Sequence, residues 1–285
     1  MPRALVFGAS GAIGRFLLPR LLAAGYDVVA VSRSARSSPG RRIEWLRGDL
    51  ADTRPPSPPV DAILSAGPLD AFAQWFSVSR IEGAPRVVAF GSQSIESKAD
   101  AADPAERALA RRLRESEQRL FDAASQHGCA CTVLRPTLIW GAGIDRSLTP
   151  LARFGMRWHA FPRIPGARGL RQPVHADDLA NACLQVLDTP AAAGRAYALG
   201  GGERLSFDAM LERVRASLPG RTIPLPLPFP LLRVLAGTAR RVGIAASGGA
   251  LDRLTLDLVA DDAPARAAFG WNPRTFRPTA ADWMP

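Results

Sequence analysis

The chain of 285 residues is 47% hydrophobic and 22% charged, which excludes global disorder and leaves enough apolar side chains for a buried core. Its formal net charge is +10, yet Lys98 is the sole lysine and the arginines are spread along the chain rather than gathered in a block. Because this skew is as typical of codon bias as of selection for a partner, we expect no nucleic-acid partner.

No apolar run reaches the roughly 18 residues that a membrane span needs. The first residues enter a strand-like run at once, so we expect neither a transmembrane segment nor a signal peptide. Three cysteines, Cys129, Cys131 and Cys183, form an odd and sparse set, which is typical of a reducing compartment and predicts a cytoplasmic protein. Although His127 lies close to Cys129 and Cys131, no fourth ligand is evident, and we predict no metal site.

The first half of the chain alternates short apolar runs with amphipathic ones. Strands are expected within residues 3–7, 27–33, 42–50, 60–68, 85–92 and 129–137, and helices within 12–25, 69–81 and 104–126. Such alternation favours right-handed βαβ units and a parallel sheet. Further along we expect a helix within 175–190, a strand within 195–201, a helix within 206–220 that Ser206 caps, and an extended segment over 222–230.

These elements predict an α/β fold, a Rossmann-like doubly wound parallel sheet with a smaller C-terminal substrate lobe. Residues 1–140 and 171–200 are expected to form the sheet domain, and residues 141–170 and 201–285 the lobe. A small-molecule substrate is expected in the cleft between them, lined from residues 92–96, 137–145 and 168–175. The sequence leaves the oligomeric state open.

Three glycines, Gly8, Gly11 and Gly14, follow the first predicted strand and open the first helix. At such a corner the helix dipole and the free backbone N–H groups can hold a pyrophosphate. Gly8 would permit the sharp turn, Gly11 the approach of a phosphate, and Gly14 the close packing of the helix on the sheet. The stretch predicts a dinucleotide site, with contacts expected from Gly8, Ser10, Gly11, Ala12, Ile13 and Gly14.

The end of the second predicted strand bears on which dinucleotide binds. Sites for NAD usually offer a carboxylate there to the ribose 2′-hydroxyl. This chain instead has Ser32, Arg33, Ser34 and Arg36, and no carboxylate. Because a guanidinium can meet a 2′-phosphate and stack on adenine, we favour NADP(H) over NAD(H), with Arg33 as the contact.

Several stretches, taken together, resemble the extended or atypical branch of the short-chain dehydrogenase/reductase superfamily, the NAD-dependent epimerase/dehydratase-like proteins. They are spread over most of the chain: GASGAIG (8–14), GDLAD (48–52), SAG (65–67), TVLRPTLIWGAG (132–143), RQPVHADDLANA (171–182), RAYALGGGERLSF (195–207) and DDAPARAAFGWNPRT (261–275). The resemblance implies a Rossmann fold and an NAD(P) cofactor. It implies that Asp49 and Leu50 lie beside the adenine base, and that Ala66 and Gly67 lie where the fourth strand meets the cofactor.

The family works through a Tyr-x-x-x-Lys pair on the long helix, in which the lysine lowers the pKa of the tyrosine and the phenolate moves the proton. In this chain the two positions fall at Leu109 and Leu113. Neither of the two tyrosines, Tyr26 and Tyr197, is followed by a lysine at that spacing. Since a leucine cannot carry a proton, the usual mechanism is excluded.

Three alternatives remain open. The first is an atypical oxidoreductase or epimerase of this family, acting on a nucleotide sugar or another carbonyl or hydroxyl compound. Candidates for its catalysis are Ser92 and Ser94 after the fifth strand, and Glu115 or Glu117 on the long helix. The second is a cofactor-binding sensor or scaffold without turnover, and the third is a reductase whose substrate takes its proton through water. The serines could instead cap the strand, and a solvent-facing helix residue is the simpler interpretation of Glu117.

The block at residues 171–182 bears on the substrate. Arg171 aligns with an arginine that holds a diphosphate in related sugar-nucleotide enzymes, so the resemblance implies a substrate contact there, and we add His175 as a candidate. No second phosphate-binding arginine is evident nearer the C-terminus. A structural role is the simpler interpretation of the acidic pair, with Asp177 or Asp178 capping the following helix. Residues 224–243, apolar with interspersed arginines, are expected to pack in the core or the pocket rather than lie on a membrane.

Overall fold

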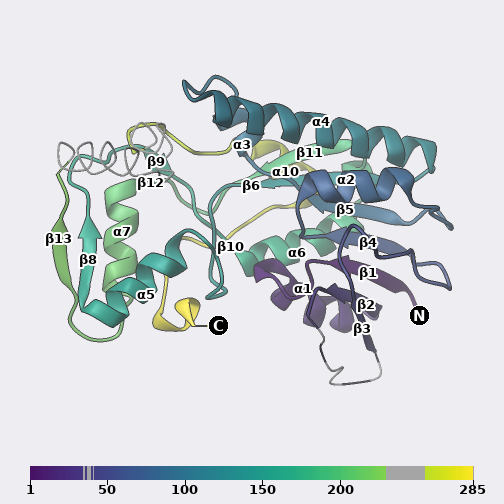
Figure 1. The fold of residues 1–285 in the computed structure, drawn as a ribbon, viewed down its shortest axis with the longest axis horizontal. Helices are drawn as coiled ribbons and strands as arrows, with labels where there is room; N and C mark the ends of the chain where they lie inside the picture. The colour runs from purple at the N-terminus through teal and green to yellow at the C-terminus, as the bar shows by residue number, and fades with distance from the viewer. Residues whose placement is uncertain (35, 37–39, 41, 229–253, 285) are drawn as a thin grey trace.

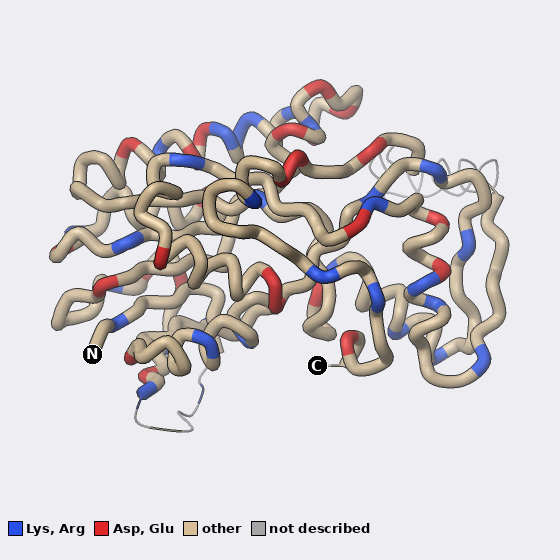
Figure 2. The backbone as a smooth tube through the Cα atoms, turned by 180° about the vertical axis from the view of Figure 1, so that it is seen from behind, with Lys and Arg blue, Asp and Glu red and all other residues tan. Residues whose placement is uncertain are grey.

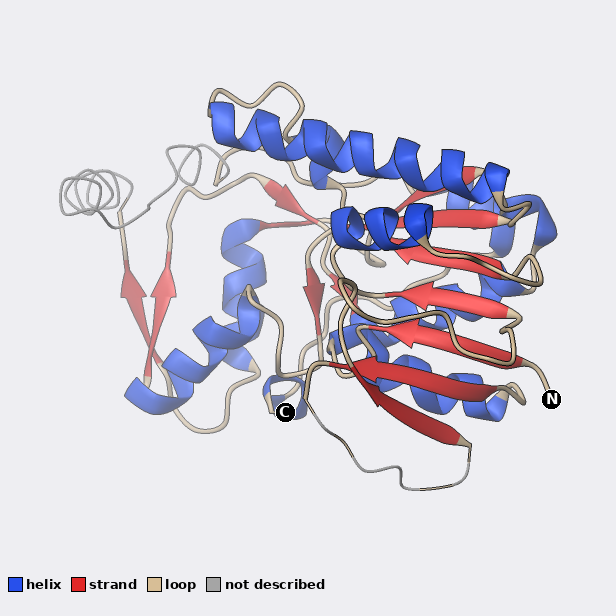
Figure 3. Ribbon diagram, turned by 45° about the vertical axis from the view of Figure 1, so that its right-hand side comes forward, coloured by secondary structure: helices blue, strands red, loops and turns tan. Residues whose placement is uncertain are grey.

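The structure is a computed structural model that describes every residue except 35, 37–39, 41, 229–253 and 285. Its centre is a seven-stranded sheet ordered β11-β6-β5-β4-β1-β2-β3, in which neighbouring strands run parallel (Figure 1, Figure 3). The strands are β1 (Arg3–Phe7), β2 (Asp27–Ser32), β3 (Ile43–Arg47), β4 (Ala62–Ser65), β5 (Arg86–Phe90), β6 (Cys131–Pro136) and β11 (Arg195–Leu199). Each lies within a stretch that the sequence predicts to be a strand, and the predicted Rossmann-like α/β fold is confirmed.

Helices cover both faces of this sheet. α1 (Ala12–Ala23) and α6 (Ala176–Leu187) pack against each other on one face, and α2 (Leu69–Val78) and α4 (Pro104–Gln126) pack together on the other (Figure 1, Figure 3). Because both faces are covered, the strands are apolar on both sides, and β1 and β5 are buried over four of their five residues.

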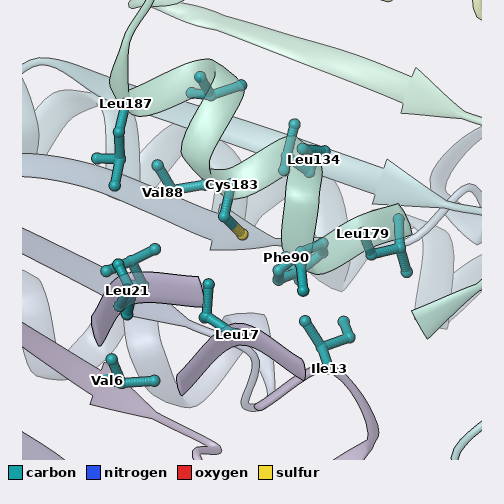
Figure 4. Close-up of a cluster of buried hydrophobic side chains, with 14 of the residues drawn as sticks. Val6, Ile13, Leu17, Leu21, Val88, Phe90, Leu134, Leu179, Cys183 and Leu187 are labelled. Atoms are coloured by element: carbon teal, nitrogen blue, oxygen red, sulfur yellow. The ribbon is translucent and has the colours of Figure 1, made fainter. Parts of the chain in front are cut away.

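The face beneath α1 and α6 holds one of the buried clusters of the sheet domain. Figure 4 shows Leu17 and Leu21 of α1 gathered with Cys183 of α6 over Val88 of β5. Burial raises the pKa of the Cys183 thiol far above its ordinary value, so the side chain stays uncharged and packs as a small apolar group. All three cysteines are free and buried.

The long helix α4 has the bounds that the sequence predicts. The carboxylate of Asp103 accepts a hydrogen bond from the N–H of Ala105 (2.9 Å), and Pro104 suits the first helical position, where an N–H would have no partner. α2 is shorter than predicted. It ends at Val78 because Ser79 adopts an extended conformation, with ψ at 142°.

The second lobe is built around a core of its own. α5 (Leu148–Trp158) and α7 (Phe207–Ala216) accompany a parallel pair of strands, β8 (Ala160–Arg163) and β13 (Ile223–Pro226) (Figure 1). Its buried centre contains Trp140, Phe161, Met210, Phe276 and Trp283. α5 and β8 fall in the stretch 141–170, for which the sequence predicts no element.

Short strand pairs join segments that are distant in the sequence. β7 (Ile139–Trp140) pairs with β10 (Val174–His175), and β9 (Leu170–Arg171) pairs with β12 (Leu205–Ser206). The Ser206 side chain then caps α7, as predicted, by accepting a hydrogen bond from a backbone N–H (3.2 Å). Two 3₁₀ turns, η1 (Pro190–Ala192) and η2 (Ala280–Trp283), lie before β11 and near the end of the described chain.

Part of the C-terminal segment returns to the sheet. α10 (Ala263–Phe269) buries Phe269 in the same cluster as α1 and α6. The indole N–H of Trp271 donates to the carbonyl of Gly200 (3.1 Å), at the end of β11. These residues therefore pack on the sheet domain, although the sequence assigns residues 201–285 to the lobe.

Charged positions are spread over the whole molecule. Figure 2 shows basic and acidic residues interspersed along the chain rather than gathered in one block. Among the helices of the described residues, none has the length and apolar character to cross a membrane. Of the segment 224–243, which the sequence predicts to pack in the core or the pocket, residues 229–243 lie outside the described residues, and β13 at its start is exposed.

Candidate functional site

The turn between β1 and α1 requires glycine at two positions. Gly8 has φ +70°, and a Cβ placed on it would lie 2.8 Å from the carbonyl atoms of Ala66, just after β4. A Cβ on Gly14 would lie 2.3 Å from the carbonyl oxygen of Ala9, so only glycine lets α1 begin so close to the turn. The turns after β1 and β4 are therefore in contact at one edge of the sheet.

The start of α1 keeps the capacity to bind an anion. Gly11 is the N-cap residue and no side chain caps the helix. The first N–H groups, including those of Ala12 and Ile13, have no carbonyl within the helix to bind. A Cβ on Gly11 would meet only the carbonyl oxygen of Gly8 (3.1 Å), so the approach to these groups is open. Together with the helix dipole, the turn fits the pyrophosphate of a dinucleotide.

The predicted adenine end of the site lies beside the same turn. The Ser32 hydroxyl, at the end of β2, donates to the Ser10 hydroxyl (3.4 Å), which brings β2 to the glycine turn. Arg33 follows with an exposed side chain. Arg36 lies over the ring of Trp45 instead, with 5.4 Å between the guanidinium carbon and the ring centroid. Of the two arginines, Arg33 is therefore the one that directly follows the strand end in contact with the turn.

Asp49 and Leu50 lie on the loop after β3. The Asp49 carboxylate accepts a hydrogen bond from the N–H of Ala51 (2.7 Å), and its side chain is exposed. A methyl carbon of Leu50 lies 3.3 Å from the position that a Cβ of Gly67 would take, so the loops after β3 and β4 meet. The predicted cofactor residues thus follow the carboxyl ends of β1 to β4 and come together at one edge of the sheet.

A cavity of about 290 Å³ opens beside the glycine turn. We call it the apolar cavity; its lining includes Ile13, Ala66, Gly67, Gly91, Leu109 and Leu113. Leu109 and Leu113 are the positions at which the resemblance implies a tyrosine and a lysine. A hydrocarbon wall therefore occupies the place of the usual proton-transferring pair. Arg112, also in the lining, lies 3.6 Å from the carboxylate of Asp70.

A second cavity, of about 250 Å³, adjoins the first at Pro136, which lines both. We call it the polar cavity; its lining includes Ser92, Ser94, Lys98, Thr137, Ser147 and Arg171. Ser94 begins the short helix α3 (Ser94–Ser97), and the Ser92 hydroxyl accepts a hydrogen bond from the N–H of Ser94 (3.2 Å). The structure therefore brings two predicted catalytic residues and Arg171 to one cavity.

Glu117 lines neither cavity. Its side chain is 5% exposed and forms an ion pair with Arg135 of β6, whose Nε donates to Oε1 at 2.9 Å. Glu96 also accepts from this guanidinium, at 2.9 Å. Burial would lower the pKa of Arg135, but the hydrogen bonds and charges of the two glutamates raise it above its ordinary value. The interpretation of Glu117 as a solvent-facing residue is wrong, because this face of α4 packs on the sheet.

Arg171 lines the polar cavity but is tied into the fold. Its side chain is buried, and Nη1 donates to the carbonyls of Leu170 (2.7 Å) and Leu256 (2.8 Å). The guanidinium carbon lies 5.0 Å from the ring centroid of Phe207. Its positive charge therefore stands at the cavity wall in a fixed position.

His175 lines neither cavity and caps α6. Its Nδ1 accepts a hydrogen bond from the N–H of Asp177 (3.1 Å), and its Nε2 lies 3.4 Å from the carboxylate of Asp282. The prediction that Asp177 or Asp178 caps this helix is wrong. Both carboxylates instead form ion pairs with Arg274, at 2.8 Å each.

Three polar residues of the polar cavity, Ser97, Lys98 and Ser147, lie outside the predicted cleft ranges. Lys98 could have been predicted from the sequence as a site residue, because it is the sole lysine and follows Ser94 by one helical turn. Nothing in the sequence marks Ser147, because the cavity forms where segments far apart in the chain meet.

Comparison with known proteins bears on the family. Residues 4–70 match the model of the NAD dependent epimerase/dehydratase family. The chain is 23% identical over 159 residues to UDP-glucose 4-epimerase of Vibrio cholerae, covering 56% of this chain and 47% of that protein. It is 24% identical over 258 residues to the mitochondrial NADH dehydrogenase (ubiquinone) 1 alpha subcomplex subunit 9 of Arabidopsis thaliana, covering 82% and 62%. The chain thus spans less than two thirds of the length of either relative.

Among solved structures, the fold is similar to that of MoeE5 in complex with UDP-glucuronic acid and NAD. The TM-score is 0.71 at 18% identity, covering 98% of this chain and 97% of that chain. At this identity the likeness concerns the fold alone. The family match is confined to residues 4–70, which include the glycine turn, whereas the similarity of fold extends over nearly the whole chain.

Proposed function

We propose that the protein binds NAD(P) at the glycine turn and acts as an atypical oxidoreductase or epimerase in the polar cavity. The observation that carries the proposal is the continuity of three features at one edge of the sheet. The uncapped start of α1, the apolar cavity beside it and the polar cavity beyond Pro136 adjoin one another. The chain thereby offers phosphate-binding backbone, apolar walls and polar groups in one continuous region.

When bound, the nicotinamide cofactor donates or accepts the hydride. The tasks of the chain are then to orient the substrate and to exclude water. The hydroxyls of Ser92 and Ser94 can hold a carbonyl or hydroxyl oxygen of the substrate, while Leu109 and Leu113 keep water from the apolar cavity. Because hydride transfer depends mainly on placement, the proton can come through water instead of a Tyr-x-x-x-Lys pair.

For the cofactor we propose NADP(H) over NAD(H), with support from the exposed Arg33 directly after β2. Arg33→Asp adds the carboxylate that NAD sites usually offer at this point. We predict that it weakens NADPH binding at least about tenfold and leaves NADH binding equal or stronger, as measured by calorimetric titration. Arg36→Ala, which removes the guanidinium over Trp45, is the matched control and should change neither affinity. Equal NADPH affinity in Arg33→Asp would contradict the preference.

The experiment for the function itself has two stages. NADPH and NADH are first titrated into the full chain, and the absorbance of NADPH is then followed against a panel of carbonyl compounds and nucleotide sugars. Turnover that Ser92→Ala abolishes supports the enzyme, because that hydroxyl lines the polar cavity. Failure to bind either nucleotide at millimolar levels would overturn the assignment.

A second candidate function is cofactor binding without turnover, as a sensor or scaffold. The hydrocarbon wall at Leu109 and Leu113 favours it, since no proton-carrying group stands there. One curated relative also bears the name of a subunit. Tight nucleotide binding with no turnover across the panel would support this candidate. For either function we propose a cytoplasmic location, which the three free, buried cysteines support.

A further inference from the structure

The lining of the polar cavity is positively charged. Within the described chain, the charged residues that line it are Lys98 and Arg171, and no acidic side chain joins them. The uncharged polar part of the wall consists of Ser92, Gln93, Ser94, Ser97, Thr137 and Ser147. Such a lining favours a ligand that has a negative charge and hydrogen-bonding oxygens.

Lys98 is the cation that can adapt to a ligand. Its side chain is 18% exposed, and its ammonium nitrogen lies 3.6 Å from Oε1 of Glu106, in the first turn of α4. This separation is longer than a hydrogen bond, and an ammonium group has three donors. The ion pair therefore positions Lys98 and leaves donors for a ligand. Arg171 differs, because Nη1 of its guanidinium is engaged with two backbone carbonyls.

We propose that Lys98 is the anion-binding residue of the polar cavity, and that the cavity takes a small compound bearing a carboxylate or a phosphate monoester. A volume of about 250 Å³ lies below the roughly 300–1,000 Å³ of most ligand pockets, so it suits a small molecule rather than a whole nucleotide sugar. Lysine binds such groups as a point charge.

The anion at Lys98 leaves the hydroxyls of Ser92 and Ser94 for a carbonyl or hydroxyl of the same molecule. Those two serines stand on the segment that leads from Gly91, in the apolar cavity, into the polar one. The inference names the substrate class of the proposed oxidoreductase, and in that respect it rests on the proposed function. Anion binding itself does not need the cofactor, so the two can be tested separately.

The sole lysine permits a direct test. Reductive methylation of the full chain with carbon-13 formaldehyde labels Lys98 and the terminal amine, so two NMR signals are expected. Inorganic phosphate, pyruvate and the neutral pyruvamide are titrated separately at constant ionic strength, with and without NADPH. We expect a saturable shift of the Lys98 signal with an anion and none with pyruvamide, while the terminal signal stays in place. Comparing the shift of the Lys98 signal with phosphate and with pyruvate shows which anion the cavity binds.

Two variants repeat the test on unmodified protein. Lys98→Met removes the charge and should weaken binding of the responding anion at least about tenfold, whereas Lys98→Arg should retain most of it. Affinity for NADPH should be unchanged in both, and thermal unfolding confirms that they fold. A Lys98 signal that saturates with neither anion, or wild-type anion affinity in Lys98→Met, would overturn the inference. A wild-type chain that binds the anion but not NADPH would overturn the proposed function alone.

Discussion

At the scale of the residue, Gly11 is a position where a substitution should affect cofactor binding but not folding. Its φ is −79°, which any residue can adopt, and a Cβ there would meet only the Gly8 carbonyl oxygen. We predict that Gly11→Ala shifts Tm by less than about 5 °C. It should weaken NADPH binding at least about tenfold, because the methyl group occupies the space through which phosphates approach the amides. Thermal unfolding and calorimetric titration measure the two effects.

Gly25, after the other end of α1, provides the control. It has φ +90°, and nothing lies within 4 Å of a Cβ built on it. Gly25→Ala should therefore cost about 1–2 kcal/mol of unfolding free energy through backbone strain and leave NADPH affinity unchanged. Wild-type affinity in Gly11→Ala would mean that the amides of this turn do not hold the cofactor.

At the scale of the element, the ion pair between Glu117 and Arg135 holds α4 to β6, and with it the wall formed by Leu109 and Leu113. Removing one partner of a buried pair leaves the other charge uncompensated. We predict that Glu117→Gln lowers the free energy of unfolding by about 3 kcal/mol, toward the low end for such pairs, because Glu96 still binds the guanidinium. Denaturant unfolding measures the change.

Glu115 on the same helix is the matched control, because its side chain is exposed. Glu115→Gln should change the free energy of unfolding by less than about 0.5 kcal/mol. The prediction would be contradicted if the Glu117→Gln variant had wild-type stability but had lost turnover. That outcome would assign Glu117 to catalysis, as the sequence also allowed, rather than to packing.

At the scale of the whole molecule, the C-terminal turn η2 fastens the second lobe to the start of α6. The carboxylate of Asp282 accepts a hydrogen bond from the N–H of Thr279 (2.7 Å) and lies 3.4 Å from Nε2 of His175. Burial would raise the pKa of this carboxyl, but its hydrogen bonds with His175 and Thr279 lower the pKa below the ordinary 3.8.

A carboxyl whose pKa is lower in the folded chain adds stability above its unfolded pKa, and this stability is lost as the pH falls through the folded value. We therefore predict that the wild type loses stability below about pH 4 more steeply than Asp282→Asn does. Denaturant unfolding over a series of acidic pH values measures the slopes. Asp261→Asn, at an exposed carboxylate, should keep the wild-type slope. Parallel slopes for the wild type and Asp282→Asn would contradict the role of this turn.

The sequence by itself determined the sheet, the glycine turn and the bounds of α4. These features depend mostly on neighbours within a few positions. Apolar periodicity marks β1 to β6, the positive φ of Gly8 is a requirement of the local backbone, and Asp103 with Pro104 suits the start of a helix. The absence of a Tyr-x-x-x-Lys pair is likewise evident from the sequence, because it depends on residue types alone.

Only the tertiary structure decided which way the polar side chains face and which of them share a cavity. Glu117 lies on a polar helix, α4, and its carboxylate is buried because it pairs with Arg135 of β6. Lys98, directly after α3, and Arg171 of β9 line one cavity although they come from separate parts of the sequence. These arrangements depend on long-range packing and on the pairing of buried charges. Local sequence periodicity predicts neither of them.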